Sequence, residues 1–172
     1  PQMVRVLDFF PEHNTAYIIM EFLEGQTLKE ITQAQGPCSA QVLLPLLEPV
    51  IRAMEAMHKA NIIHRDISPD NLMLLSNGTM KLMDFGCARD TTQGDATMTI
   101  PLKHGYAPLE QYQPTGQRPW TDVYGLSATI YYCLPGKTPP QAPDRLLAAD
   151  ITMPRRLALD PPATHAQAQP PS

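Results

Sequence analysis

The sequence lacks the uninterrupted apolar run of about 20 residues that a membrane-spanning helix requires, and it shows no signal-peptide pattern. It is also short of positive charge, since 13 lysine and arginine residues stand against 17 aspartate and glutamate residues and give a net charge of −4. The basic residues are scattered rather than clustered. Nucleic acid and anionic membrane surfaces are therefore not expected as partners.

Cysteine is scarce as well. Cys38, Cys87 and Cys133 are odd in number, lie far apart and follow no metal-ligand spacing. Reduced thiols in a cytoplasmic protein are the simplest interpretation of this pattern. An initiator methionine is also missing, because the chain begins with Pro1 in sequence that is typical of a strand. We therefore expect a fragment that is truncated at its N-terminus.

What the sequence does contain is an apolar fraction of 43%, which is sufficient for a hydrophobic core. Apolar segments at residues 4–10 and 16–20 flank a turn and predict an antiparallel hairpin. Thr27 is expected to cap a short helix over residues 28–33, and Ser39 a long helix that extends through residue 60. Pro45 and Pro49 interrupt that long helix, so we expect it to start late or to be kinked.

The rest of the chain alternates short apolar segments with polar ones. Residues 62–63, 72–75 and 80–83 predict strands, the last two joined by an Asn-Gly turn, and residues 120–133 predict a second, buried helix. Residues 86–105 are polar and aperiodic, which is typical of a functional loop. The final 15 to 20 residues are rich in proline, alanine and glutamine, and their composition predicts disorder.

Residues suited to phosphate chemistry follow one another in order. The stretch HRDISPDN occupies residues 64–71, and within it Asp66 is followed five positions later by Asn71. DFG follows at residues 84–86, and GYAPLE at residues 105–110. A carboxylate can orient a hydroxyl and accept its proton, while carboxylate and amide oxygens hold Mg²⁺ against phosphates. The set predicts phosphoryl transfer.

These motifs, together with DVYGL at residues 122–126, resemble those of the eukaryotic-type (Hanks-type) protein kinase catalytic domain, and in detail those of bacterial serine/threonine kinases. The resemblance covers about residues 3–150. It implies an α+β fold with a mostly helical large lobe and the last strands of the small lobe. The expected parts are the end of the small lobe at residues 1–23, the large lobe at 24–153, and a tail at 154–172.

The resemblance also implies roles for individual residues. Asp66 would be the catalytic base, and Asn71 and Asp84 would hold Mg²⁺. ATP would be bound by the gatekeeper, the hinge around residues 21–23 and a residue under the adenine ring: Met20, Glu21, Leu23 and Met73.

Three further residues are implied to support the catalytic loop. Arg65 would pair with a phosphate on the activation loop, where threonines 91, 92, 97 and 99 are candidate acceptors. Asp122 would brace the loop structurally, and His64 is expected to be a packed core histidine rather than an acid–base group.

Ser68 departs from the family pattern. Protein-serine kinases usually carry a lysine two residues after the catalytic aspartate, and it contacts a threonine two residues before the tyrosine of the Gly-Tyr-type motif. This chain has Ser68 in place of that lysine, and the facing position has shifted to Lys103, three residues before Tyr106. We therefore hypothesise that hydroxyl and ammonium have exchanged sides, with Lys103 supplying the positive charge that stabilises the transferring phosphoryl group.

The resemblance implies a kinase that uses ATP, Mg²⁺ and a protein substrate, and that self-associates through its activation segment. Serine/threonine specificity rests on Ser68-Pro69-Asp70, which differs from the tyrosine-kinase pattern. No Gly-rich loop or phosphate-binding strand lysine occurs, so the isolated chain is expected to bind ATP weakly and transfer phosphate negligibly. The alternatives are a pseudokinase or binding module, and a small-molecule phosphotransferase, which Arg65 and the APLE-bounded loop disfavour.

Overall fold

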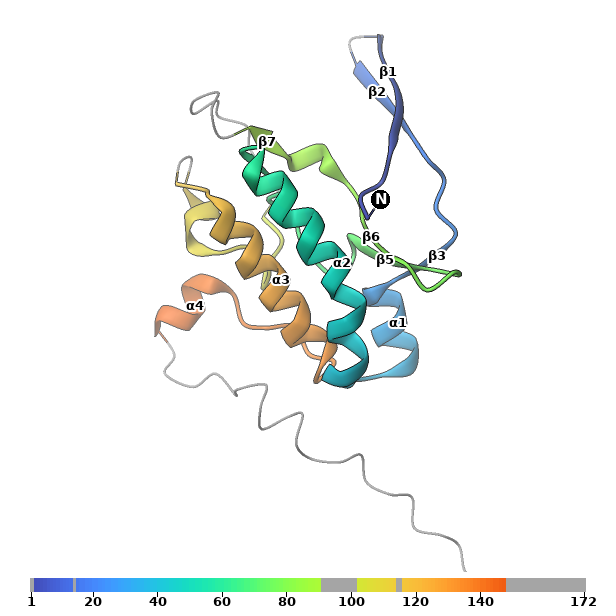
Figure 1. Cartoon of the computed structure of the whole chain (residues 1–172). Helices are drawn as coiled ribbons and strands as arrows, with labels where there is room; N and C mark the ends of the chain where they lie inside the picture. Colours follow the sequence, from blue (N-terminus) through green and yellow to red (C-terminus); the bar gives the residue numbers. More distant parts are fainter. Residues whose placement is uncertain (1, 14, 91–101, 114–115, 148–172) are drawn as a thin grey trace, which may run out of the picture.

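A computed structural model describes residues 2–13, 15–90, 102–113 and 116–147. The predictions for the threonine-rich loop, for self-association through it, and for the C-terminal tail concern residues that lie wholly or mostly outside these ranges. Figure 1 shows a body built around helices, with small sheets at one side and one hairpin that projects away from it. The expected α+β class is confirmed.

Two long helices lie side by side in the body, α2 at Ala40–Lys59 and α3 at Pro119–Cys133 (Figure 1). α1, at Leu28–Gln35, packs nearby and begins with a capping box, in which Thr27 and Glu30 each bind the other's backbone N–H. The short helix α4, at Ala142–Leu147, follows α3. The helices predicted from Thr27, from Ser39 and at residues 120–133 are thus confirmed.

The long helix was expected either to start late or to be kinked, and the late start is wrong, because α2 begins at Ala40 and contains both Pro45 and Pro49. An interior proline costs about 3 kcal/mol or more, whereas complete burial of one large apolar side chain contributes about 1.5–3 kcal/mol. Packing of the apolar stripe therefore outweighs the two prolines. The large side chains of the buried stripe are Leu43, Leu47, Val50, Met54 and Met57.

The strands of the body are short. β3 (Gly25–Thr27), β5 (Leu72–Leu75) and β6 (Met80–Leu82) form one antiparallel sheet in the order β3-β5-β6. The predicted turn between β5 and β6 is present, with Gly78 at φ +79°. β4 (Ile62–Ile63) pairs with β7 (Arg89–Asp90), and the 3₁₀ turn η1 (Phe85–Cys87) lies just before β7. A second 3₁₀ turn, η2, spans Leu109–Tyr112.

One hydrophobic core joins these elements. It contains side chains from α1, α2, β5, β6 and α3, among them Leu28, Leu47, Leu72, Leu82 and Leu126. The loop of residues 64–71 connects β4 to β5, and its Ile67 belongs to the same core. None of the helices in the described part of the chain is long and apolar enough to cross a bilayer.

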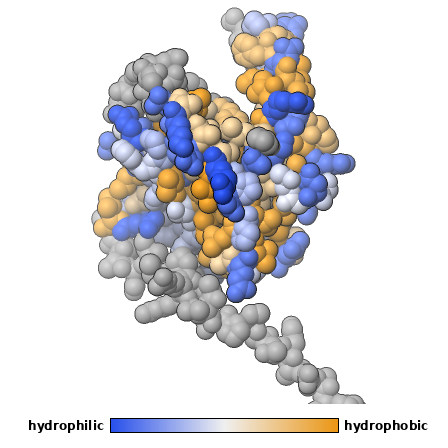
Figure 2. Space-filling model, in the orientation of Figure 1, coloured by the Kyte–Doolittle hydropathy of each residue, from blue (hydrophilic) through white to orange (hydrophobic). Residues whose placement is uncertain are grey.

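The projecting hairpin consists of β1 (Val6–Glu12) and β2 (Thr15–Met20), which pair antiparallel as predicted. It is attached to the body at its base, where the N–H of Val4 donates to the carbonyl of Leu82 at 3.0 Å and the N–H of Leu82 donates to the carbonyl of Gln2 at 2.8 Å. Figure 2 shows the hairpin largely coloured as hydrophobic. Its apolar side chains are therefore exposed on the surface.

Candidate active site

The loop of residues 64–71 is anchored by one buried carboxylate. Asp122, in the first turn of α3, is 1% exposed and accepts the backbone N–H of His64 and of Arg65, both at 2.8 Å. The Nε2 of His58 on α2 lies 2.8 Å from the same carboxylate. Gly125, one turn along α3, permits this close approach, because a Cβ there would lie 2.8 Å from the carbonyl oxygen of Ile67. The bracing role implied for Asp122 matches this geometry.

His64 is completely buried, and its two ring nitrogens have different partners. Nε2 lies 3.0 Å from the carbonyl oxygen of Met83, which can only accept, so Nε2 carries the proton. Nδ1 accepts the backbone N–H of Asp66 at 3.3 Å. Burial lowers the pKa of His64, which agrees with a neutral imidazole. His64 is thus a packed, hydrogen-bonded residue, as expected, and it helps to place the backbone of Asp66.

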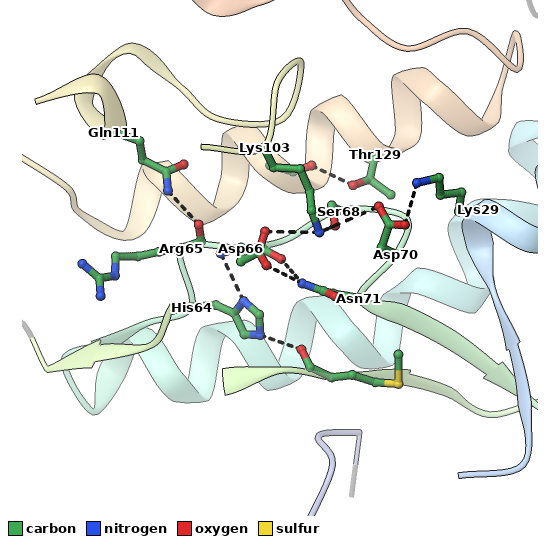
Figure 3. A network of polar contacts seen from close by, with 12 residues as sticks. Lys29, His64, Arg65, Asp66, Ser68, Asp70, Asn71, Lys103, Gln111 and Thr129 are labelled. Carbon is green, nitrogen blue, oxygen red and sulfur yellow. Dashed lines mark hydrogen bonds and ion pairs between the residues drawn. The ribbon is translucent and has the colours of Figure 1, made fainter. Parts of the chain in front are cut away.

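Asp66 and Asn71 meet across the loop (Figure 3). The side-chain amide of Asn71 donates to the backbone oxygen of Asp66 at 2.7 Å and to its carboxylate Oδ2 at 2.8 Å. Asn71 is buried, whereas the side chain of Asp66 keeps 18% of its surface exposed. Asp66 is therefore held in one orientation while its carboxylate still reaches solvent.

Lys103 and Ser68 are in contact, as the exchange hypothesis predicts. The ammonium of Lys103 donates to the Ser68 hydroxyl at 2.8 Å and lies 3.4 Å from the carboxylate of Asp66. It also lies 3.8 Å from Asp70, which forms a 2.8 Å ion pair with Lys29 of α1. In Figure 3 these groups converge on one point beside Asp66. The positive charge of Lys103 thus lies next to Asp66, the expected base, although the loop has Ser68 where a lysine is usual.

The two expected magnesium ligands come from neighbouring segments. The N–H of Met83 donates to the carbonyl of Asn71 at 2.9 Å, and Asp84 follows at once with φ +57°, a left-handed conformation that is uncommon for a non-glycine residue. Because Asn71 uses its amide nitrogen on Asp66, its amide oxygen is directed elsewhere. Asn71 and Asp84 are oxygen donors of the kind Mg²⁺ takes when phosphates supply other ligands, so the residues fit this ion.

The four residues expected to bind ATP come from two strands of different sheets and from the segment after β2. Met20 ends β2 and is 44% exposed, whereas Met73 is half-buried in β5. Glu21 links the two regions, because its carboxylate accepts the N–H of Arg5 at 2.9 Å and forms an ion pair with Lys81, the β6 partner of Met73. The hydrogen bond from Lys81 lowers the pKa of Glu21. Leu23 is half-buried in the segment that follows.

Some contacts of the loop involve residues that no sequence pattern marked. The backbone oxygen of Arg65 accepts a hydrogen bond from Gln111, and its guanidinium donates to Gln117. Both glutamines are uncharged and distant in sequence from the loop, so neither spacing nor charge pattern could have revealed them. Outside the loop, Glu110 of the APLE motif accepts the Thr121 hydroxyl at 2.9 Å.

Comparison with known proteins identifies the family. The protein kinase domain model matches residues 1–166, nearly the whole chain. The chain belongs to the protein kinase family.

Among curated relatives it is 34% identical over 142 residues to a protein of Clostridium perfringens named probable serine/threonine-protein kinase, covering 81% of this chain and 21% of the relative. It is 32% identical over 139 residues to the serine/threonine-protein kinase PknL of Mycobacterium tuberculosis, covering 80% of this chain and 35% of the relative. It is also 32% identical over 141 residues to PrkC of Bacillus subtilis, covering 81% of this chain and 22% of the relative. The chain thus spans between 21% and 35% of the length of these three relatives.

Proposed function

We propose that the protein is a serine/threonine kinase that transfers the γ-phosphate of ATP to serine and threonine hydroxyls of protein substrates. The observation that carries this proposal is the placement of the Lys103 ammonium 2.8 Å from Ser68 and 3.4 Å from Asp66. A carboxylate with a cation beside it is the arrangement that transfer of a charged phosphoryl group to a hydroxyl requires.

Each residue of this group has a chemical task. Asp66, held by Asn71, orients the substrate hydroxyl and accepts its proton. Lys103 stabilises the negative charge on the transferring phosphoryl oxygens, and Ser68 orients Lys103 by accepting its hydrogen bond. The ammonium group thus belongs to residue 103, outside the loop, and not to the loop position that Ser68 occupies.

The nucleotide would occupy the region between the hairpin and β5. Met20, Glu21, Leu23 and Met73 would contact the adenine, and Asn71 and Asp84 would hold Mg²⁺. When bound, ATP with Mg²⁺ supplies the phosphoryl group and neutralises its charge. In this assignment residues 1–23 end the small lobe and residues 24–153 form the large lobe. The three free cysteines favour a reducing compartment such as the cytoplasm.

The intact set of Asp66, Asn71 and Asp84 favours an enzyme over a pseudokinase scaffold. To test this, the full-length protein is incubated with radiolabelled ATP and peptides whose acceptor is serine, threonine or tyrosine. We expect labelled serine and threonine peptides, and a rate about 10²–10⁴-fold lower for the isosteric variant Asp66→Asn, which cannot accept the proton.

Two outcomes would contradict the proposal. Equal rates for the wild type and Asp66→Asn would show that a contaminating kinase transfers the phosphate. No transfer by a wild-type protein that binds ATP normally would favour the scaffold.

A further inference from the structure

Arg65, directly before the expected base, has a backbone conformation that its surroundings must maintain. Its φ of +67° lies in the left-handed region, which is unfavourable for a non-glycine residue. Arg65 is also 5% exposed, so its polar groups must find partners inside the protein. Asp122 accepts its N–H at 2.8 Å, but the carbonyl and the guanidinium need other partners.

Gln111 meets the backbone carbonyl of Arg65. It lies in η2, and its side-chain Nε2 donates to that oxygen at 2.7 Å (Figure 3). A carbonyl oxygen can only accept, so the amide nitrogen of Gln111 must face it. This bond holds the peptide unit that joins Arg65 to Asp66.

Gln117 contacts the guanidinium group of Arg65. Its side-chain oxygen accepts from Nη1 of Arg65 at 3.1 Å, and its amide nitrogen donates to the carbonyl of Gln113 at 3.2 Å. The Nε of Arg65 donates to the carbonyl of Cys87 at 2.5 Å. Gln117 is 6% exposed, so its contact with the guanidinium is shielded from water. The side-chain oxygen of Gln117 and the backbone oxygen of Cys87 thus both accept from the guanidinium.

We propose that Gln111 and Gln117 are positioning residues that together hold Arg65, and through it the backbone of Asp66, in the catalytic loop. The functional part of this inference rests on the proposed kinase activity. The two glutamines have opposite hydrogen-bonding roles, since Gln111 is a donor to Arg65 and Gln117 is an acceptor.

Because one glutamine donates to Arg65 and the other accepts from it, replacement by glutamate should affect the two positions differently. Glutamate is nearly isosteric with glutamine but only accepts, so Gln111→Glu turns a carboxylate toward the Arg65 carbonyl, whereas Gln117→Glu pairs a carboxylate with the guanidinium. Gln113→Glu is the matched control, because the exposed side chain of Gln113 lies in the same segment and the change in charge is identical.

In the full-length protein we expect Gln111→Glu to lower kcat by about ten- to a hundred-fold with KM for ATP little changed, because a buried carbonyl loses its donor. Gln117→Glu should lose less than about three-fold and Gln117→Leu about ten-fold, because both remove the donor to the Gln113 carbonyl but only the leucine also removes the acceptor of Nη1 of Arg65. Gln113→Glu should match the wild type. Equal kcat for Gln111→Glu and Gln113→Glu, or equal losses for Gln117→Glu and Gln117→Leu, would overturn the positioning role.

Hydrogen exchange of the loop peptide supplies a readout that does not need activity. Residues 64–71 should exchange faster in Gln111→Glu than in Gln113→Glu while the thermal midpoint of both remains near that of the wild type. This result would support the positioning role even if the wild type transferred no phosphate, an outcome that would remove the proposed function alone. Unchanged exchange in Gln111→Glu would overturn the positioning role.

Discussion

The β1–β2 hairpin and the loop of residues 64–71 place their side chains in opposite environments. Eight large apolar side chains of the hairpin are between 37% and 59% exposed, whereas the polar side chains of His64 and Ser68 are completely buried. The hairpin is shaped by its own backbone pairing and by local contacts such as the stacked rings of Phe10 and Tyr17, 5.4 Å apart. The loop is shaped by α3, by η2 and by Lys103.

The comparison shows that burial does not follow residue type in these two regions. Apolar residues are commonest inside and polar residues outside, yet here the polar loop is the more deeply buried of the two. Buried polar groups need hydrogen-bond partners, and the loop finds them in Asp122, Asn71 and Gln111. An isolated two-stranded hairpin is marginally stable, so its geometry is the less constrained.

The largest effect on kcat is expected when the positive charge of Lys103 beside the loop is removed. Lys103→Met in the full-length protein should reduce kcat by about 10²–10³-fold, because the developing charge on the phosphoryl group loses its cation. The double variant Ser68→Lys with Lys103→Thr, which restores the more common arrangement, should recover most of the loss. Steady-state phosphorylation of a serine peptide measures both. A Lys103→Met rate within a few-fold of the wild type would refute the exchange.

A second test compares the loss of a buried leucine with the loss of an exposed leucine in α2. Leu47→Ala in α2 removes a side chain with 0% exposure and should lower the free energy of unfolding by about 2–5 kcal/mol. Leu44→Ala, three residues away and 48% exposed, should change it by less than about 0.5 kcal/mol. Urea unfolding followed by circular dichroism distinguishes them. Similar losses for the two variants would mean that the core does not lie where the structure puts it.

The pH dependence of stability should report the neutral state of His64. Because burial lowers its pKa in the fold, the unfolded chain, with the ordinary value of 6.5, takes up a proton first as the pH falls. The contribution of His64 is therefore complete above 6.5 and declines below it, by at most about 1.4 kcal/mol per pH unit.

Unfolding free energies between about pH 5.5 and about pH 7.5 measure this slope. His64→Asn should flatten it, whereas His13→Gln, whose imidazole is 82% exposed, should leave it unchanged. Identical slopes for the wild type and both variants would contradict a buried neutral His64.

The smallest effect is expected in the hairpin. Leu7→Ser and Ile18→Ser replace side chains that are 54% and 51% exposed, so each should change the free energy of unfolding by less than about 0.5 kcal/mol. Both should reduce the fluorescence of an apolar dye, because they remove exposed apolar surface. A loss of stability comparable with that of Leu47→Ala would show that the hairpin is packed against the body.

Prediction from the sequence succeeded where the signal was local. The hairpin, the Thr27 cap of α1, the Asn-Gly turn and the long helix after Ser39 all depend on residues close together in the chain. Of the two outcomes predicted for α2, a late start or a kink, the late start was wrong, because the local cost of Pro45 and Pro49 is outweighed by packing against distant elements. The contact between Lys103 and Ser68 was predicted by family resemblance and is confirmed.

The sequence by itself determined the family of this protein, the order of its catalytic motifs and the residues that carry charge into the site. It could do so because those features depend on residue type and spacing. Only the tertiary structure decided that Gln111 and Gln117 hold the loop, from 46 and 52 positions away from Arg65. Hydrogen bonds over such distances in the chain depend on how whole elements pack, and packing leaves no period or spacing in the sequence.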